Sequence, residues 1–162
     1  MAAPVANEVL QQIGSAALCP RCRGVLDVLW LPQAGEESAQ TIALRAGFRN
    51  RIHLAHELAK HGLPPLTALR DWICLLTWVR EWEVGGYPLV RQAWDGGREP
   101  SVCYRTVHRV TRLAWREARL VGLGHWIREF DRALRLRSRC PNFDHPKLRG
   151  EGVPRAASEP NA

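Results

Sequence analysis

The chain has 162 residues, enough for one ordinary domain, and its hydrophobic content of 46% excludes a disordered protein. Its net charge is +7, and all of its 23 basic residues except Lys60 and Lys147 are arginines. No apolar run reaches the roughly 20 residues that span a bilayer. The five cysteines are irregularly spaced, and no positively charged signal-peptide region opens the chain. We therefore expect a soluble protein of a reducing cytoplasm without membrane association.

The first 37 residues are expected to form a short, irregular N-terminal segment. Residues 9–17 can form a short helix, and residues 25–31 a short strand or a helical turn. A segment of this length cannot build a core of its own. It is therefore expected to pack on the helices after residue 38.

Helical periodicity begins at residue 38. Ser38 is the expected N-cap of a helix through Ala46, and Gly47 ends that helix because glycine tolerates the left-handed conformation of a tight turn. A second helix is expected from Asn50 to His61, stopped by Gly62. Its expected inner face comprises Ile52, Leu54, Leu58 and Ala59.

Pro64 and Pro65 open a longer helix that is expected to continue to about Glu83, before Gly85 and Gly86. A helix of roughly 18 residues is about 27 Å long. Its expected inward residues follow steps of three and four: Leu66, Leu69, Trp72, Ile73, Leu76 and Val79.

The same cycle then repeats. A short helix is expected over residues 88–94, a turn over 95–97, and another helix from Pro100 or Ser101, with Cys103, Val107 and Val110 on one face. Further helices are expected after a loop at 112–115, the last being an amphipathic basic helix over 126–136. The predicted fold is thus all-α, with a domain over 38–140 and a flexible tail over 141–162.

Two stretches share the plan of a short helix, a glycine turn and a second helix, at residues 41–54 and 89–104. In a helix-turn-helix unit, the N-terminal residues of the second helix meet base edges in the major groove. Arginine and asparagine can contact guanine and adenine with two hydrogen bonds, and hydroxyl, histidine and arginine side chains suit phosphate. The candidate DNA-binding residues are Arg49, Asn50, Arg51, His53, Arg98, Ser101, Tyr104, Arg105, Thr106, His108 and Arg109.

The stretch Ala46-Gly47-Phe48-Arg49-Asn50, followed by Leu54, Leu58, Gly62 and Pro65, resembles the DNA-binding module of the AraC/XylS-type transcriptional regulators. In the second stretch, Ala93, Gly97, Cys103 and Val107 match the same pattern, and Arg112 stands where that family usually has glycine. The resemblance implies two helix-turn-helix units, a linker helix that holds them about one DNA turn apart (roughly 34 Å), and sequence-specific binding to promoter DNA.

Charge divides the two units unequally. Residues 98–139 hold eleven arginines and four acidic residues, so the rest of the chain sums to zero. A basic half joined to a neutral half is typical of nucleic-acid binders. We therefore expect the first unit to supply more of the base reading and the second more of the phosphate affinity.

The sequence gives less support to a metal site or an enzyme active site. Cys19 and Cys22 form a CxxC pair, whose distant partners for zinc would be Cys140 and His145; two unligated thiols are the favoured interpretation, so no metal is expected. His53, His56 and His61 are expected to face solvent or phosphate, and most tryptophans to lie in the core. No nucleophile–base pair or phosphate loop is evident, so neither an enzyme nor a cofactor is predicted.

Two alternatives to a DNA-binding regulator stay open. One is a helical protein-interaction adaptor that keeps the fold without DNA binding. The other is a zinc-stabilised protein associated with nucleic acid through the Cys19 and Cys22 pair. Double-stranded DNA is the expected partner, and a protein partner or homodimer is compatible with the sequence.

Overall fold

The computed structural model describes residues 19–31 and 37–138, and within these ranges all regular secondary structure is helical. The predicted all-α class is thus confirmed. The eight helices of the described residues are α2 (Pro20–Leu29), α3 (Ala39–Arg45), α4 (Arg51–Lys60), α5 (Leu66–Gly85), α6 (Leu89–Asp95), α7 (Pro100–Thr111), α8 (Trp115–Val121) and α9 (Leu123–Ser138).

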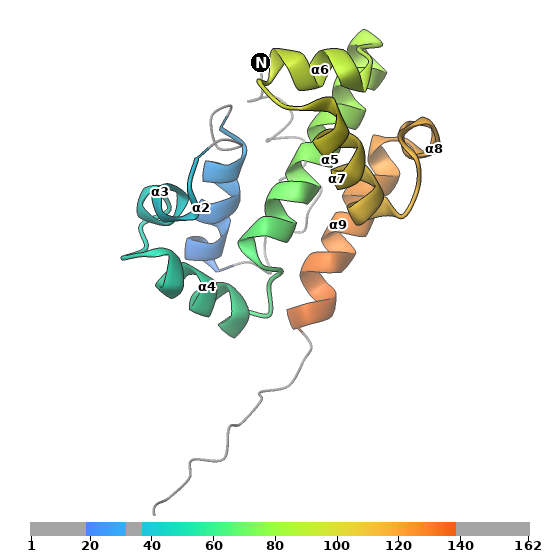
Figure 1. The fold of residues 1–162 in the computed structure, drawn as a ribbon. Helices are drawn as coiled ribbons and strands as arrows, with labels where there is room; N and C mark the ends of the chain where they lie inside the picture. The colour runs from blue at the N-terminus through green and yellow to red at the C-terminus, as the bar shows by residue number, and fades with distance from the viewer. Residues whose placement is uncertain (1–18, 32–36, 139–162) are drawn as a thin grey trace, which may run out of the picture.

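The long helix α5 runs through the centre of the molecule (Figure 1), with α2, α3 and α4 on one side and α7, α8 and α9 on the other. It contacts α2, α6, α7, α8 and α9. At 20 residues it is about 30 Å long. Because so many elements pack on it, the two halves of the chain share one core.

Helix boundaries fall where the local chemistry places them. The Ser38 hydroxyl accepts a hydrogen bond from the backbone N–H of Thr41 at 3.1 Å, so the expected N-cap of α3 is confirmed. Gly47 and Gly62 have positive φ angles and lie just after α3 and α4, so these helices end at the expected glycines. Gly97, in the turn after α6, also has a positive φ angle. The long helix ends two residues later than expected, at Gly85.

The N-terminal segment is more regular than predicted. Residues 20–29 form a helix, so the strand alternative is wrong. Pro20 occupies the first helical turn, where a missing N–H is harmless, and the Cys19 side chain caps the helix. Cys22, Val25, Leu26 and Leu29 are buried, and the helix contacts α3 and α5. The expected helix over 9–17 and the expected tail over 141–162 lie outside the described residues.

Three apolar residues expected in the core face solvent instead. The side chain of Ile52 is 72% exposed and that of Trp94 is 69% exposed, while Ala59 is also exposed. The predicted inner faces otherwise hold, since Leu54 and Leu58 of α4 are buried. The central helix also buries Leu75, which the sequence did not single out, and Trp78, one of the tryptophans, most of which were expected in the core.

Candidate nucleic-acid interface

The turns at residues 43–48 and 93–98 have the same backbone hydrogen bonds. The N–H of Phe48 donates to the carbonyl of Ala43 at 2.8 Å, and 50 residues later the N–H of Arg98 donates to the carbonyl of Ala93 at 2.8 Å. Gly47 and Gly97 adopt positive φ angles of 79° and 64° between these partners. Both alanines are fully buried. The two stretches are therefore copies of one helix–turn–helix geometry.

The second helices of the two copies also bury equivalent residues. Leu54 and Leu58 form the buried face of α4, and Cys103 and Val107 form that of α7, 49 positions later. The turn before α7 is one residue shorter than the turn before α4. These four side chains hold both second helices against the core, so their opposite faces are left at the surface.

Each copy includes a third helix that precedes the turn. In the first copy α2 contacts α3, and α3 contacts α4. In the second copy α5 contacts both α6 and α7, and α6 contacts α7. A helix thus precedes each copy and packs on the first helix of that copy: α2 on α3, and α5 on α6, where α5 also contacts α7.

Two arginine side chains near the start of α4 are exposed to solvent. Arg49 and Arg51 are exposed, and neither guanidinium forms an ion pair or hydrogen bond with any other residue that the structure describes; the backbone N–H of Arg51 donates to Gln40 Oε1 at 3.1 Å. The exposed side chain of Ile52 lies next to them in the sequence. The N-terminal end of α4 and the residue before its N-cap therefore present two uncompensated positive charges and one apolar group.

Two other predicted DNA-binding residues of this unit, Asn50 and His53, make contacts within the fold. Asn50 is the N-cap of α4, and its Oδ1 accepts a hydrogen bond from the N–H of His53 at 2.8 Å. The ring of His53 is half-buried and meets Phe48 edge-to-face, with ring centroids 5.7 Å apart. These contacts orient both side chains, which lie beside Arg49 and Arg51 in the sequence.

The exposed face of α7 carries the predicted polar residues of the second unit. Ser101, Tyr104, Arg105 and His108 are exposed, whereas Thr106 is buried. Arg105 has no ion-pair partner among the described residues. By contrast, the paired arginines of α9 form ion pairs within that helix, with Glu129 and Asp131 as partners of Arg132 and Arg135.

Arg98 and Arg109 instead turn toward α5. Arg98 donates a hydrogen bond to Cys74 Sγ at 2.9 Å and lies 5.9 Å from the ring centre of Trp78. Arg109 forms two hydrogen bonds to the carboxylate of Asp71, at 2.8 and 2.9 Å. These bonds raise the pKa of the Arg109 guanidinium, which stays charged. Both residues border an open hollow of about 750 Å³ between α5 and α7.

The CxxC pair lies at the start of α2, and the structure brings to it a residue that the sequence did not connect with it, His61. The histidine lies 42 positions away, so no local spacing could have indicated the contact. Burial raises the pKa of the Cys22 thiol, so this sulfur is a poor redox nucleophile at neutral pH. The expected zinc partners Cys140 and His145 lie outside the described residues.

Within the described ranges, no helix is both long and apolar enough to cross a membrane. Comparisons with models of protein families, with curated proteins and with solved structures found no match to this chain.

Proposed function

We propose that this protein binds double-stranded DNA by placing α4 and α7 in two successive segments of the major groove, and that it regulates transcription in the manner of the AraC/XylS-type regulators. The observation that carries the proposal is the duplicated turn, with the same hydrogen bond at Ala43–Phe48 and Ala93–Arg98. Each copy presents a second helix whose outer face carries uncompensated arginine.

The dimensions of the central helix support the proposal. The major groove is about 12 Å wide and admits one α-helix. Successive turns of DNA are about 34 Å apart, and α5, which separates the two units, is about 30 Å long for its 20 residues. A single chain could therefore place both second helices on one face of a duplex.

The residues at the start of α4 suit base reading. The guanidinium forks of Arg49 and Arg51 match the two acceptors of guanine, and the exposed side chain of Ile52 suits the methyl group of thymine. On α7, Ser101, Arg105 and His108 suit phosphate oxygens, which position the protein without reading sequence. Arg98 and Arg109 are already held by α5, so their contribution to DNA is smaller than the sequence alone indicates.

The proposal is tested by selecting bound duplexes from a random library and then measuring affinity for selected and random DNA at several salt concentrations. Arg51→Ala should lose roughly 5- to 150-fold affinity for the selected site and little for random DNA, because one bidentate base contact provides about 1–3 kcal/mol of discrimination. Arg105→Ala should weaken binding to both and reduce the salt slope by about one.

Arg128→Ala is the matched control, since Arg128 is an exposed arginine of α9. Its loss removes the same charge from a helix outside both units. Equal affinity for every duplex would rule out sequence-specific regulation. Absence of DNA binding would instead favour the adaptor alternative.

A further inference from the structure

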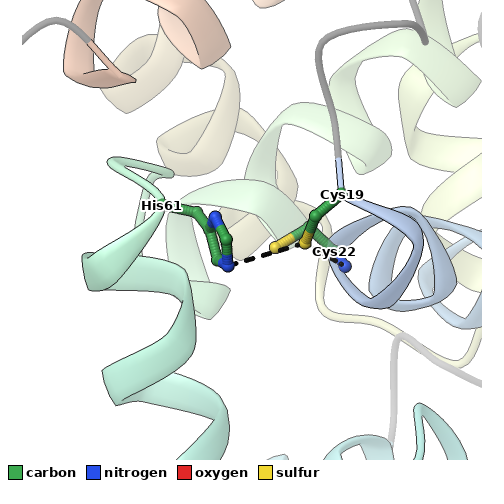
Figure 2. A group of neighbouring side chains, drawn as sticks. All are labelled: Cys19, Cys22 and His61. Atoms are coloured by element: carbon green, nitrogen blue, oxygen red, sulfur yellow. Dashed lines mark hydrogen bonds between the residues drawn. The ribbon is translucent and has the colours of Figure 1, made fainter.

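Three potential metal ligands converge at the edge of the first unit (Figure 2). Cys19 and Cys22 come from the start of α2, and His61 directly succeeds the last residue of α4. Their ligand atoms, two sulfurs and one imidazole nitrogen, all lie within 4.8 Å of one another. The two helices thus place a Cys₂His donor set at one point, from segments far apart in the sequence.

The spacing matches tetrahedral coordination. Cys19 Sγ lies 3.6 Å from His61 Nε2. Bonds of about 2.3 Å from zinc to sulfur and about 2.0–2.1 Å to nitrogen, at a tetrahedral angle, separate these atoms by about 3.6 Å. Thiolate and imidazole ligands together select zinc over the harder magnesium and calcium ions. The distance between Cys19 and His61 and the donor types therefore fit this ion.

A backbone N–H and a carboxylate lie beside the three ligands. The backbone N–H of Cys22 points at Cys19 Sγ, with a nitrogen–sulfur distance of 3.4 Å. Cys19 is also the N-cap of the ten-residue helix α2, which fixes the position of this sulfur. One carboxylate lies close by, because Glu57 Oε2 is 3.7 Å from His61 Nε2 and its side chain is only 15% exposed.

We propose that Cys19, Cys22 and His61 bind one structural zinc ion, and that the carboxylate of Glu57, which contacts His61 but lies outside the three-residue cluster, rotates in as the fourth ligand. The ion would join the first turn of α2 to the C-terminal end of α4, and so fix the second helix of the first unit. In the second unit the ion pair between Arg109 and Asp71 joins α7 to α5 in a comparable way. The zinc site does not depend on the proposed DNA binding.

The test uses the full chain, purified without chelators, and measures zinc per chain by mass spectrometry. Replacement of zinc by Co²⁺ should give a thiolate-to-cobalt charge-transfer band and the intense visible bands of tetrahedral cobalt. One metal ion per chain is expected. His61→Asn and Cys19→Ser should each weaken cobalt binding by more than about 100-fold, since even loss of an outer-shell partner weakens binding by 10- to 100-fold.

The controls are His56→Asn, which changes another exposed histidine of α4, and Cys74→Ser, which changes a half-buried cysteine outside the cluster. Both should keep the metal. Because His61 is exposed, His61→Asn should keep the helical circular dichroism, so loss of metal is separable from unfolding. Glu57→Gln should weaken binding and shift the visible cobalt bands, and an unchanged spectrum would overturn its assignment as a ligand.

Three results would overturn the site as a whole. One is a chain that takes up neither zinc nor cobalt. Another is metal retained equally by His61→Asn and Cys19→Ser. The last is a disulfide between Cys19 and Cys22 in freshly purified protein, seen as the loss of two hydrogen masses.

Discussion

Arg112 is the one non-glycine residue with a positive φ angle among the residues that the structure describes. Its φ of 61° ends α7, as the φ of 65° at Gly62 ends α4. For a residue with a Cβ, the left-handed conformation costs roughly 1–2 kcal/mol. The second unit therefore keeps a backbone turn for which glycine is the favoured residue.

Arg112→Gly should stabilise the protein by about 0.5–1 kcal/mol. It relieves the left-handed strain, although the greater freedom of glycine in the unfolded chain offsets part of the gain. Arg116→Gly, inside α8, is the control and should destabilise the protein by about 1 kcal/mol, since glycine is a poor residue in a helix interior. Urea unfolding of both variants measures the difference, and the same sign for both would contradict the conformational explanation.

Asn50 combines a cap with a position at the proposed base-reading surface. Asn50→Ala should lose about 1 kcal/mol of stability, because the N–H of His53 loses its acceptor. Asn50→Ser should keep the stability within about 0.5 kcal/mol, since serine caps equally well. Chemical denaturation compares the two variants. A loss of DNA affinity in Asn50→Ser at unchanged stability would identify a base contact, whereas unchanged affinity would leave capping as the role.

At the scale of helices, the sequence predicts what local chemistry decides. Ser38, Gly47, Gly62 and Gly97 mark boundaries because capping and positive φ angles act within a few residues. These signals were enough to predict where α3 begins and where α3, α4 and the turn after α6 end.

The errors arise where tertiary packing decides. Ile52 fits the apolar period of α4 and yet faces solvent, because Leu54 and Leu58 suffice to bury the other face. Helix α2 contains the weak helix formers Gly24, Val25 and Val28, and its packing against α3 and α5 stabilises it. The meeting of His61 with Cys19 depends on how α2 and α4 pack, which no spacing encodes.

The tight packing of the first turn gives a prediction about Ala43. Its side chain is fully buried beside the turn. Ala43→Leu should destabilise the protein by about 1–3 kcal/mol, the usual cost of overpacking a core. Ala55→Leu, at an exposed position of α4, is the control and should change stability by less than about 0.5 kcal/mol. Equal effects on thermal unfolding would contradict the close packing.

The ion pair between α5 and α7 gives a prediction that rests on the proposed function. Asp71→Asn should release Arg109 toward phosphate, raise affinity for random DNA several-fold and increase the salt slope by about one. The fold should persist, because an ion pair with side chains 60% and 22% exposed contributes less than about 1 kcal/mol. Asp131→Asn, which frees Arg135 on α9, is the charge-matched control. An equal gain in both variants would point to net charge alone.

The helices that the structure describes pack around α5 in one core. Trp72 of α5 stacks on Phe130 of α9, with ring centroids 5.6 Å apart. At the other end, the Glu83 carboxylate of α5 accepts a hydrogen bond from the N–H of Leu123 at 2.7 Å. Because the second unit and α9 pack on the same helix that the first unit leads into, one core holds α4 and α7.

This shared core predicts how the selected DNA site responds to insertions. Five added base pairs between the two half-sites rotate them by about half a turn, so only one unit can bind. Ten added base pairs restore the face but add about 34 Å, which the fixed length of α5 cannot span. Both insertions should reduce affinity to that of a duplex with one half-site. Fluorescence anisotropy on the three duplexes measures this, and recovery with ten base pairs would show two flexibly joined units instead.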